Sequence, residues 1–218
     1  QSLLNQGVDV LHICDSEFNL SYNHALDICK EINKRSLGEQ VKWYTYMSPA
    51  PFDSELAKEM AQAGCVGVDF TGDSANEAML RTYNQKHRKE NISESVKLCK
   101  ENGMAVMVDL LLGGPGETPQ TAKETIDFSK EINADCIGAT LGMRVYPGTF
   151  MEKYVTEQLY RGNYASIKRK YHGPLNLLMP TFYISEQLGE NPAELIKSFI
   201  DGDKRFFEPA GEDSSDYN

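Results

Sequence analysis

Residues Met104 to Thr118 read MAVMVDLLLGGPGET, and this segment carries the clearest signal for the fold. Its first nine residues are apolar except for Asp109, a composition typical of a strand buried on both faces of a parallel sheet. Three glycines and a proline follow, and Pro119 then stands at the first position of a helical segment. A buried strand, a glycine-rich turn and a helix in succession predict one β/α unit.

The same unit recurs along the chain. Four more apolar runs with strand-like composition occur at Val8–Cys14, Val41–Tyr46, Gly64–Phe70 and Ala134–Met143. Capping residues and apolar residues at helical spacing predict helices over Ser21–Arg35, after Asp53, from Asn91, after Pro119 and over Asn191–Ile200. Because strands that alternate with crossover helices pair in parallel, the fold class is α/β, either a barrel or an open parallel sheet.

Charge and composition exclude several classes of function. The chain has 218 residues, with 22 Lys+Arg against 32 Asp+Glu and a formal net charge of −10. An acidic chain lacks the basic surface that phosphate backbones attract, so we expect no nucleic-acid partner. No apolar run approaches the ~20 residues of a membrane span, so we expect no membrane partner. The five cysteines are scattered without a CxxC pair, which favours reduced thiols in a cytoplasmic protein.

Candidate binding residues lie where the predicted strands end, since parallel α/β folds bind ligands beyond the carboxyl ends of their strands. Asp15, Glu17 and Asp73 are carboxylates at such ends. A carboxylate there accepts hydrogen bonds from ribose hydroxyls or an ammonium group, or else caps the following helix. The loop from Gly113 to Thr118 exposes backbone N–H groups to a flat or anionic ligand, or else is only a tight turn. It lacks the Lys-Ser/Thr of a P-loop and the spacing of a dinucleotide-binding loop.

Four motifs at these strand ends together resemble the radical SAM enzymes. In order along the chain they are DSEFN from Asp15, TGDS from Thr71, GGPGET from Gly113 and VYPGT from Val145. The resemblance is nearest to the class that is often coupled to a cobalamin-binding domain and labelled Fe-S oxidoreductase or magnesium-protoporphyrin-cyclase-like. It runs from about Val8 to Thr149 and implies a partial (β/α) barrel of parallel strands with outer helices.

The chain departs from this family at one point. The family holds its [4Fe–4S] cluster in a CxxxCxxC loop after the first strand, and this sequence contains no such motif. The resemblance therefore implies that residues 1–150 form a radical SAM barrel whose first strand is missing. Residues 151–218 are expected to form a small helical C-terminal extension, with a disordered acidic tail beyond Pro209.

The resemblance also implies a role for each candidate residue. Asp15, Ser16 and Glu17 stand where the family's backbone holds the methionyl amino group of S-adenosylmethionine (SAM). Asp73 and Ser74 stand near its ribose. The remaining cofactor-binding candidates face the adenine side or line the next strand end, and they are Gly113, Gly114, Pro115, Gly116, Glu117, Arg144 and Tyr146. No metal ligand is expected in this chain, and the sequence identifies no catalytic residue.

The implied cofactors are SAM, a [4Fe–4S] cluster in the parent protein, and cobalamin through a separate upstream domain. In the family the reduced cluster cleaves SAM to a 5′-deoxyadenosyl radical, which requires an electron donor such as flavodoxin or ferredoxin. We therefore expect an enzyme that needs the missing cluster segment and acts on an unidentified small molecule. Two alternatives stay open: a non-radical α/β-barrel enzyme that binds phosphate at Gly113–Gly116, and a non-enzymatic binding module.

Overall fold

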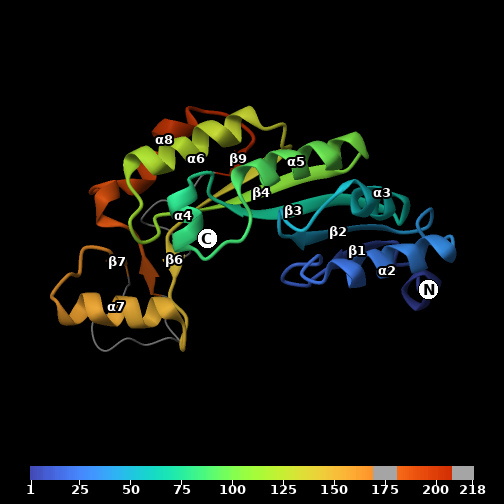
Figure 1. The fold of residues 1–218 in the computed structure, drawn as a ribbon, viewed down its shortest axis with the longest axis horizontal. Helices are drawn as coiled ribbons and strands as arrows, with labels where there is room; N and C mark the ends of the chain where they lie inside the picture. The colour runs from blue at the N-terminus through green and yellow to red at the C-terminus, as the bar shows by residue number, and fades with distance from the viewer. Residues whose placement is uncertain (169–180, 208–218) are drawn as a thin grey trace. The chain divides into compact units, whose positions relative to one another are not determined.

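The main sheet has six strands in the order β1-β2-β3-β4-β5-β9 (Figure 1). The structure, a computed structural model, describes residues 1–168 and 181–207. The strands of this sheet are β1 (Val10–Ile13), β2 (Lys42–Met47), β3 (Cys65–Asp73), β4 (Ala105–Leu112), β5 (Cys136–Leu141) and β9 (Phe206–Phe207). Strand β2 pairs in parallel with both β1 and β3, as crossover helices require. The expected α/β class, with parallel strands and outer helices in a partial barrel, is confirmed.

The chain divides into two compact units that are each discontinuous in sequence. The first comprises residues 1–72, 86–109 and 129–138, and the second comprises residues 73–85, 110–128 and the described residues from 139 on. The division expected at residue 150 stays a prediction, and the tail predicted to be disordered beyond Pro209 lies outside the described residues.

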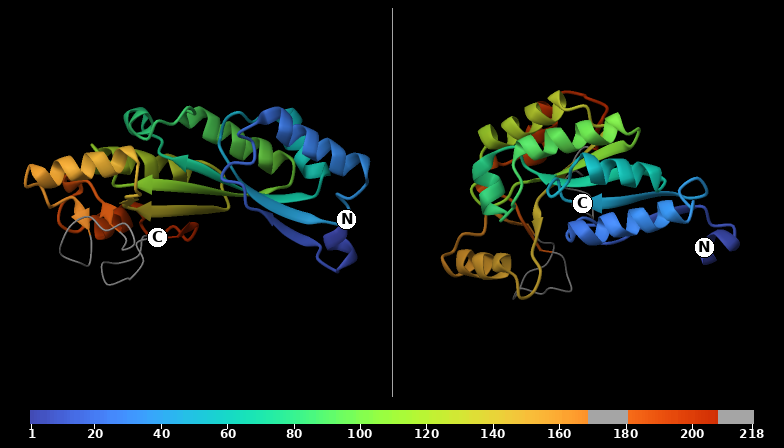
Figure 2. Two further views of the ribbon diagram at one scale, coloured as in Figure 1. Left: turned by 90° about the horizontal axis from the view of Figure 1, so that it is seen from below. Right: turned by 45° about the vertical axis from the view of Figure 1, so that its right-hand side comes forward.

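In the first unit, helices cover one face of strands β1, β2 and β3 (Figure 2). They are α2 (Tyr22–Lys34), α3 (Ser54–Gln62) and α5 (Lys89–Glu101), and the short α1 (Ser2–Asn5) precedes β1. Side chains of β2 alternate between the two faces, as the pleat requires. Trp43, Thr45 and Met47 are buried, whereas Tyr44 and Tyr46 point to the opposite face and are exposed.

The second unit adds a small antiparallel sheet in the order β6-β8-β7. Its strands are β6 (Met143–Arg144), β7 (Ile167–Lys168) and β8 (Phe182–Tyr183). Its helices are α4 (Glu77–Thr82), α6 (Pro119–Glu131), α7 (Phe150–Tyr160), α8 (Pro192–Ile200) and the 3-10 turn Glu186–Leu188. Val145, Val155 and Tyr183 form a buried cluster between α7 and this sheet.

The caps explain where several helices begin. Asp53 precedes α3 and accepts from the Leu56 amide at 3.0 Å, as its position in the sequence predicts. The predicted start of α5 at Asn91 is two residues late, because the helix begins at Lys89 and the Asn91 side chain instead accepts from the Arg88 amide at 2.9 Å.

None of the helices among residues 1–168 and 181–207 is long and apolar enough to cross a membrane.

The strand predicted over Val8–Cys14 is shorter in the structure, at Val10–Ile13, and two other predicted strands end differently. The strand predicted over Gly64–Phe70 continues to Asp73, so the first three residues of the TGDS motif belong to β3 and Ser74 follows the strand. The strand predicted over Ala134–Met143 divides at Gly142, whose φ of 97° breaks the extended run. The residues after it enter the small antiparallel sheet as β6.

Candidate functional site

Three aromatic rings lie on the face of the first unit's strands opposite the helices. Tyr44 and Tyr46 are 44% and 38% exposed there. The His12 ring of β1 stacks on Tyr44, with 4.3 Å between ring centroids and 16° between ring planes, and its centroid lies 5.0 Å from that of Tyr46. His12 Nε2 is buried and has no hydrogen-bond partner among the described residues. The rings therefore form a surface that can contact a ligand through both stacking and a hydrogen bond.

Two carboxyl groups, Asp69 of β3 and Asp109 of β4, lie beside these rings. Asp69 is aligned with Tyr46 in the parallel register. Burial, followed by the charges of both carboxylates, raises the pKa of the Tyr46 hydroxyl. Burial, and then the charge of Asp109, raises the pKa of Asp69 to about 7. The inner-face cluster consists of His12, Tyr44, Tyr46, Asp69 and Asp109.

One carboxylate oxygen of the inner-face cluster is free to accept a hydrogen bond. Asp69 Oδ1 is buried and has no hydrogen-bond partner among the described residues. A buried carboxylate oxygen left in this state is costly, and a hydroxyl or ammonium donor relieves that cost. Gly138 of β5 leaves the space that the Asp109 carboxylate occupies, because a Cβ at that glycine would contact Asp109 Oδ1. The cluster is therefore prepared to accept hydrogen bonds.

The three candidates after β1 do not share one environment. Asp15 and Ser16 are exposed, whereas Glu17 is half-buried and its Oε1 accepts from the Thr71 hydroxyl at 3.2 Å. Asp15 does not cap the next helix, since the residue that precedes α2 is Ser21. Of these three residues, Glu17 is the one whose side chain the structure brings to the end of β3.

Asp73 and Ser74 are held by different partners within the second unit. Asp73 has a left-handed φ of 55° and accepts from the Gln85 side-chain amide. Asn76 caps α4, so Asp73 does not. Ser74 is fully buried, and its hydroxyl lies 2.9 Å from that of Thr125 in α6. Asp73 keeps a carboxylate at the strand end, whereas the Ser74 hydroxyl serves the packing of α6.

The glycine loop is closed by its own glutamate. Glu117 is fully buried, and its Oε2 accepts from the Gly113 amide and lies 3.4 Å from the Tyr83 hydroxyl. The Gly114 amide donates to the same Tyr83 hydroxyl at 3.2 Å. Burial raises the pKa of Glu117 to about 7, although these hydrogen bonds oppose the shift. Two loop N–H groups are thus used internally beside a buried carboxyl group, which argues against phosphate binding at Gly113–Gly116.

The last two candidates lie next to each other in the second unit. The Arg144 guanidinium stands 5.1 Å from the centroid of the Tyr146 ring, which is 53% exposed. Arg144 belongs to β6, where it pairs with Phe182 of β8. A guanidinium stacked on an exposed ring presents both a charge and a flat surface to a ligand.

Sequence reasoning missed the inner-face cluster apart from Asp109. The signal for the tyrosines was the alternation in KWYTYM, which places Tyr44 and Tyr46 on one face of a strand. The signal for Asp69 was a charge inside the apolar run CVGVDF. In the part of the chain that the structure describes, no group of three or more His, Cys, Asp or Glu residues is placed to hold a metal ion.

Comparison with known proteins gives a consistent set of relatives. A family model described as the radical SAM superfamily matches residues 1–129. Tryptophan 2-C-methyltransferase from Streptomyces laurentii is 35% identical over 72% of this chain and 28% of that protein. Anaerobic magnesium-protoporphyrin IX monomethyl ester cyclase from Cereibacter sphaeroides is 26% identical over 62% of this chain and 22% of that protein.

A solved structure matches this chain over all of its 218 residues. The radical SAM methyltransferase TsrM from Kitasatospora setae, with tryptophan and a SAM analogue bound, is 27% identical with a TM-score of 0.85, over 100% of this chain and 48% of TsrM. A second TsrM structure holds cobalamin and a [4Fe–4S] cluster and matches with the same TM-score of 0.85. The chain thus spans less than half the length of these relatives. Because the family model covers more than half of the chain, the protein belongs to the radical SAM superfamily and is similar to its cobalamin-associated class.

Proposed function

We propose that this chain is the SAM-binding part of a radical SAM methyltransferase that works with cobalamin. The observation that carries the proposal is the inner-face cluster, where Asp69 Oδ1 is buried without a partner among the described residues. Support comes also from the likeness, over the whole chain, to a methyltransferase whose structure holds a SAM analogue. Bound SAM supplies a methyl group or, after reductive cleavage, a 5′-deoxyadenosyl radical.

The residues of this chain fit SAM and do not fit the iron-sulfur cluster. SAM carries two ribose hydroxyls and an ammonium group, all of which are donors, and the Asp69 and Asp109 carboxyl groups are acceptors. A [4Fe–4S] cluster needs cysteine thiolates, and the sequence has no CxxxCxxC motif. The proposal therefore places the cluster, the cobalamin-binding domain and the electron donor outside this chain.

Each protein group has a distinct task in this proposal. Asp69, charged above about pH 7, accepts from a SAM donor and so replaces the solvation that burial has removed. The Glu17 carboxylate is held by the Thr71 hydroxyl, so it does not have to be ordered when the ligand binds. These groups bind and orient SAM, and no proton transfer is assigned to them.

The test is calorimetric titration of the 218-residue chain with S-adenosylhomocysteine at pH 8. This probe keeps the ribose and the ammonium group and does not require the cluster. Asp69→Asn removes the charge and keeps the shape, so we expect its Kd to rise at least tenfold, the loss of about one charged hydrogen bond. Asp127→Asn is the matched control, because Asp127 is exposed on α6 and pairs with Lys123. Absence of binding to the unmodified chain, or an unchanged Kd in Asp69→Asn, would overturn the proposal.

A further inference from the structure

Glu117 is a buried carboxyl group without a cationic partner. It ends the glycine loop of the second unit and is fully buried. Burial and hydrogen-bond donors act on its charge, and no Lys or Arg in the described part of the chain is among them. Its Oε1 is buried and has no hydrogen-bond partner within residues 1–168 and 181–207. Neutral groups alone therefore have to compensate the negative charge of this carboxylate.

The other carboxylate oxygen holds the glycine loop. Glu117 Oε2 accepts from the Gly113 amide and lies 3.4 Å from the Tyr83 hydroxyl oxygen. The same hydroxyl accepts from the Gly114 amide at 3.2 Å. Two successive loop amides therefore depend on one carboxylate oxygen, the first directly and the second through Tyr83.

Further contacts of the loop do not involve this charge. The Ser185 amide donates to the Gly113 carbonyl oxygen at 2.8 Å, and the Ser185 hydroxyl donates to the Glu117 carbonyl oxygen at 2.8 Å. The Glu117 amide donates to the Gly114 carbonyl oxygen at 3.1 Å. These bonds are made by groups that do not titrate, so they hold the fold of the loop in either charge state of Glu117.

The titratable groups that face Glu117 are themselves neutral or negative. From the end of α4 it faces Tyr83, whose hydroxyl has a pKa raised by burial and by the Glu117 charge and so stays protonated. Asp73, at the end of β3, acts on Tyr83 as a second negative charge. The segment after β8 contributes the neutral Ser185 hydroxyl. Burial raises the pKa of Glu117 to about 7, so its charge changes near neutral pH.

We infer that Glu117 is a positioning residue that holds the glycine loop firmly when it is ionised and loosens it when it is protonated. The proton comes from solvent and goes to Oε1, the oxygen without a partner, so that no existing hydrogen bond has to break. Oε2 then changes from a charged into a neutral acceptor. Since charge-assisted hydrogen bonds are about twice as strong as neutral ones, the Gly113 amide is held less firmly.

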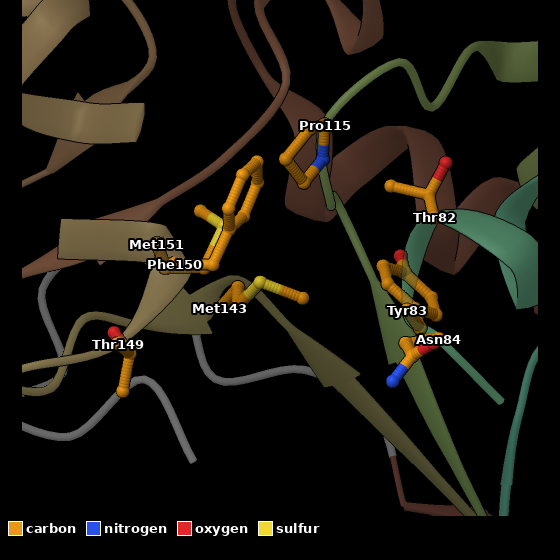
Figure 3. A pocket seen from close by; sticks show the side chains of 8 residues that line it. All are labelled: Thr82, Tyr83, Asn84, Pro115, Met143, Thr149, Phe150 and Met151. Carbon is orange, nitrogen blue, oxygen red and sulfur yellow. The ribbon is translucent and has the colours of Figure 1, made fainter. Parts of the chain in front are cut away.

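The same change reaches the wall of a pocket of about 500 Å³ in the second unit. Tyr83 and Pro115 both line this pocket, and Figure 3 shows Pro115 above Tyr83. The Tyr83 ring packs so closely on Gly114 that a Cβ there would collide with it, which couples the ring to the loop. The charge of Glu117 therefore sets how firmly this wall is held. The inference goes beyond the proposed function and requires no ligand.

The test measures amide hydrogen exchange by NMR in the full 218-residue chain at pH 6 and pH 8. Each exchange rate is divided by the intrinsic rate at that pH, which gives a protection factor. The Gly142 amide is the internal reference, because it donates to the Leu112 carbonyl oxygen at 2.8 Å and this acceptor does not titrate. Relative to Gly142, we expect the protection factor of Gly113 to rise about fivefold from pH 6 to pH 8.

Two glutamine variants assign this rise to one residue. Glu117→Gln keeps the shape of the side chain and cannot ionise, so the protection of Gly113 relative to Gly142 should be equal at both pH values. Glu190→Gln is the matched control, because Glu190 is exposed in the same unit, and this variant should retain the rise. The absence of a rise in the unmodified chain, or an equal rise in Glu117→Gln, would overturn the inference.

A second measurement decides the question if Glu117→Gln does not fold. The ¹³C chemical shift of the Glu117 carboxyl carbon reports its ionisation directly in the unmodified chain. Its midpoint should coincide with the midpoint of the Gly113 protection, and midpoints that differ by about one pH unit or more would overturn the inference. Neither measurement uses SAM or a related ligand. A negative result therefore leaves the proposed function intact, and a failure of S-adenosylhomocysteine to bind leaves this inference intact.

Discussion

At the scale of single residues, Asp69 is a group whose surroundings oppose its charge. Its pKa in the folded chain is about 7 against an ordinary value of 3.8, because of burial and the charge of Asp109. The folded state therefore holds this proton more tightly than the unfolded state, and stability falls as the pH rises from about 4 to about 7. The ionised form of this carboxylate is the one that binds the ligand in the proposed function, and ionisation lowers the stability of the folded chain.

Asp69→Asn should therefore stabilise the chain at pH 8. Since the carboxyl group is partly exposed, solvent screening limits the gain in unfolding free energy to about 1–2 kcal/mol. Urea denaturation at pH 8 and pH 4 measures this gain, which should vanish at pH 4, where the aspartate is protonated in the folded state. Asp127→Asn, on the surface, should change stability by less than about 0.5 kcal/mol. A variant less stable than the unmodified chain at pH 8 would contradict the account of the pKa.

A second residue, Tyr83, holds the glycine loop. Its hydroxyl contacts the Leu111 carbonyl, the Gly114 amide and the Glu117 carboxyl group. Tyr83→Phe leaves these buried groups without that partner and should cost about 1–3 kcal/mol of unfolding free energy. Thermal denaturation measures the loss, and Tyr160→Phe on the surface provides the control. Equal melting temperatures for the two variants would show that the hydroxyl does not hold the loop.

Site residues could be predicted only where their position along a strand was enough. Glu17 and Asp73 were predicted because carboxylates that follow apolar runs lie at strand ends, and their role in binding stays a prediction. The inward orientation of Glu117 could not be predicted, because it depends on Tyr83, which is 34 residues away in the sequence. Asp69 escaped notice because its role depends on the neighbouring Asp109 across the sheet, and a single strand does not reveal that pairing.

At the scale of elements, β4 and β5 pack closely at one glycine. A Cβ at Gly138 would occupy the place of the Asp109 carboxylate, so Gly138→Ala should cost about 1–3 kcal/mol of unfolding free energy. In an Asp109→Ala background that space is vacated, and the same change should cost at least about 1 kcal/mol less. Urea denaturation of the unmodified chain, the two single variants and the double variant gives the four unfolding free energies of this double-mutant cycle.

The matched control for this cycle is Gly67→Ala in β3. A Cβ at Gly67 would meet its nearest neighbour, the Ala105 carbonyl oxygen, at the ordinary distance of 3.6 Å. This change should be tolerated in either background. If Gly138→Ala cost the same with and without Asp109, the contact between the carboxylate and the glycine would not be what requires glycine there.

The elements that sequence predicted are those with strong local signals. Strand β4 has a near-continuous apolar run and β2 alternates between its two faces, whereas Asp53 caps α3 and α6 begins at Pro119. Helix α7 was missed although its signal was present. Thr149 caps it by accepting from the Glu152 amide at 3.3 Å, and a Thr-x-x-Glu pattern marks such a start. The two-residue strands of the small sheet carry no local pattern, since they are defined by their partners.

At the scale of the whole molecule, the parallel topology could be predicted, whereas its division could not. Alternating strands and helices leave few ways to connect a sheet, so the order from β1 to β5 follows from the sequence. The two compact units each combine distant segments, and their composition depends on contacts that no local pattern encodes. The pairing of β9 at the far edge depends on such contacts as well.

The sheet order also leaves β1 with a strand on one side only among the described residues. Its Val10 is 58% exposed, and an exposed apolar edge strand is a template for pairing between chains. We therefore expect this chain to self-associate as its concentration rises. Val10→Lys places a charge on that edge and should lower the mean mass measured by light scattering at a given concentration.

Leu20→Lys separates edge pairing from a general effect of charge. Leu20 is 75% exposed and lies outside the strands, so this variant changes the net charge equally without touching the edge. If edge pairing drives association, Val10→Lys lowers the mean mass and Leu20→Lys does not. An equal fall in both variants would assign the association to net charge, and a chain that stays monomeric at every concentration would show that the short β1 does not recruit a partner strand.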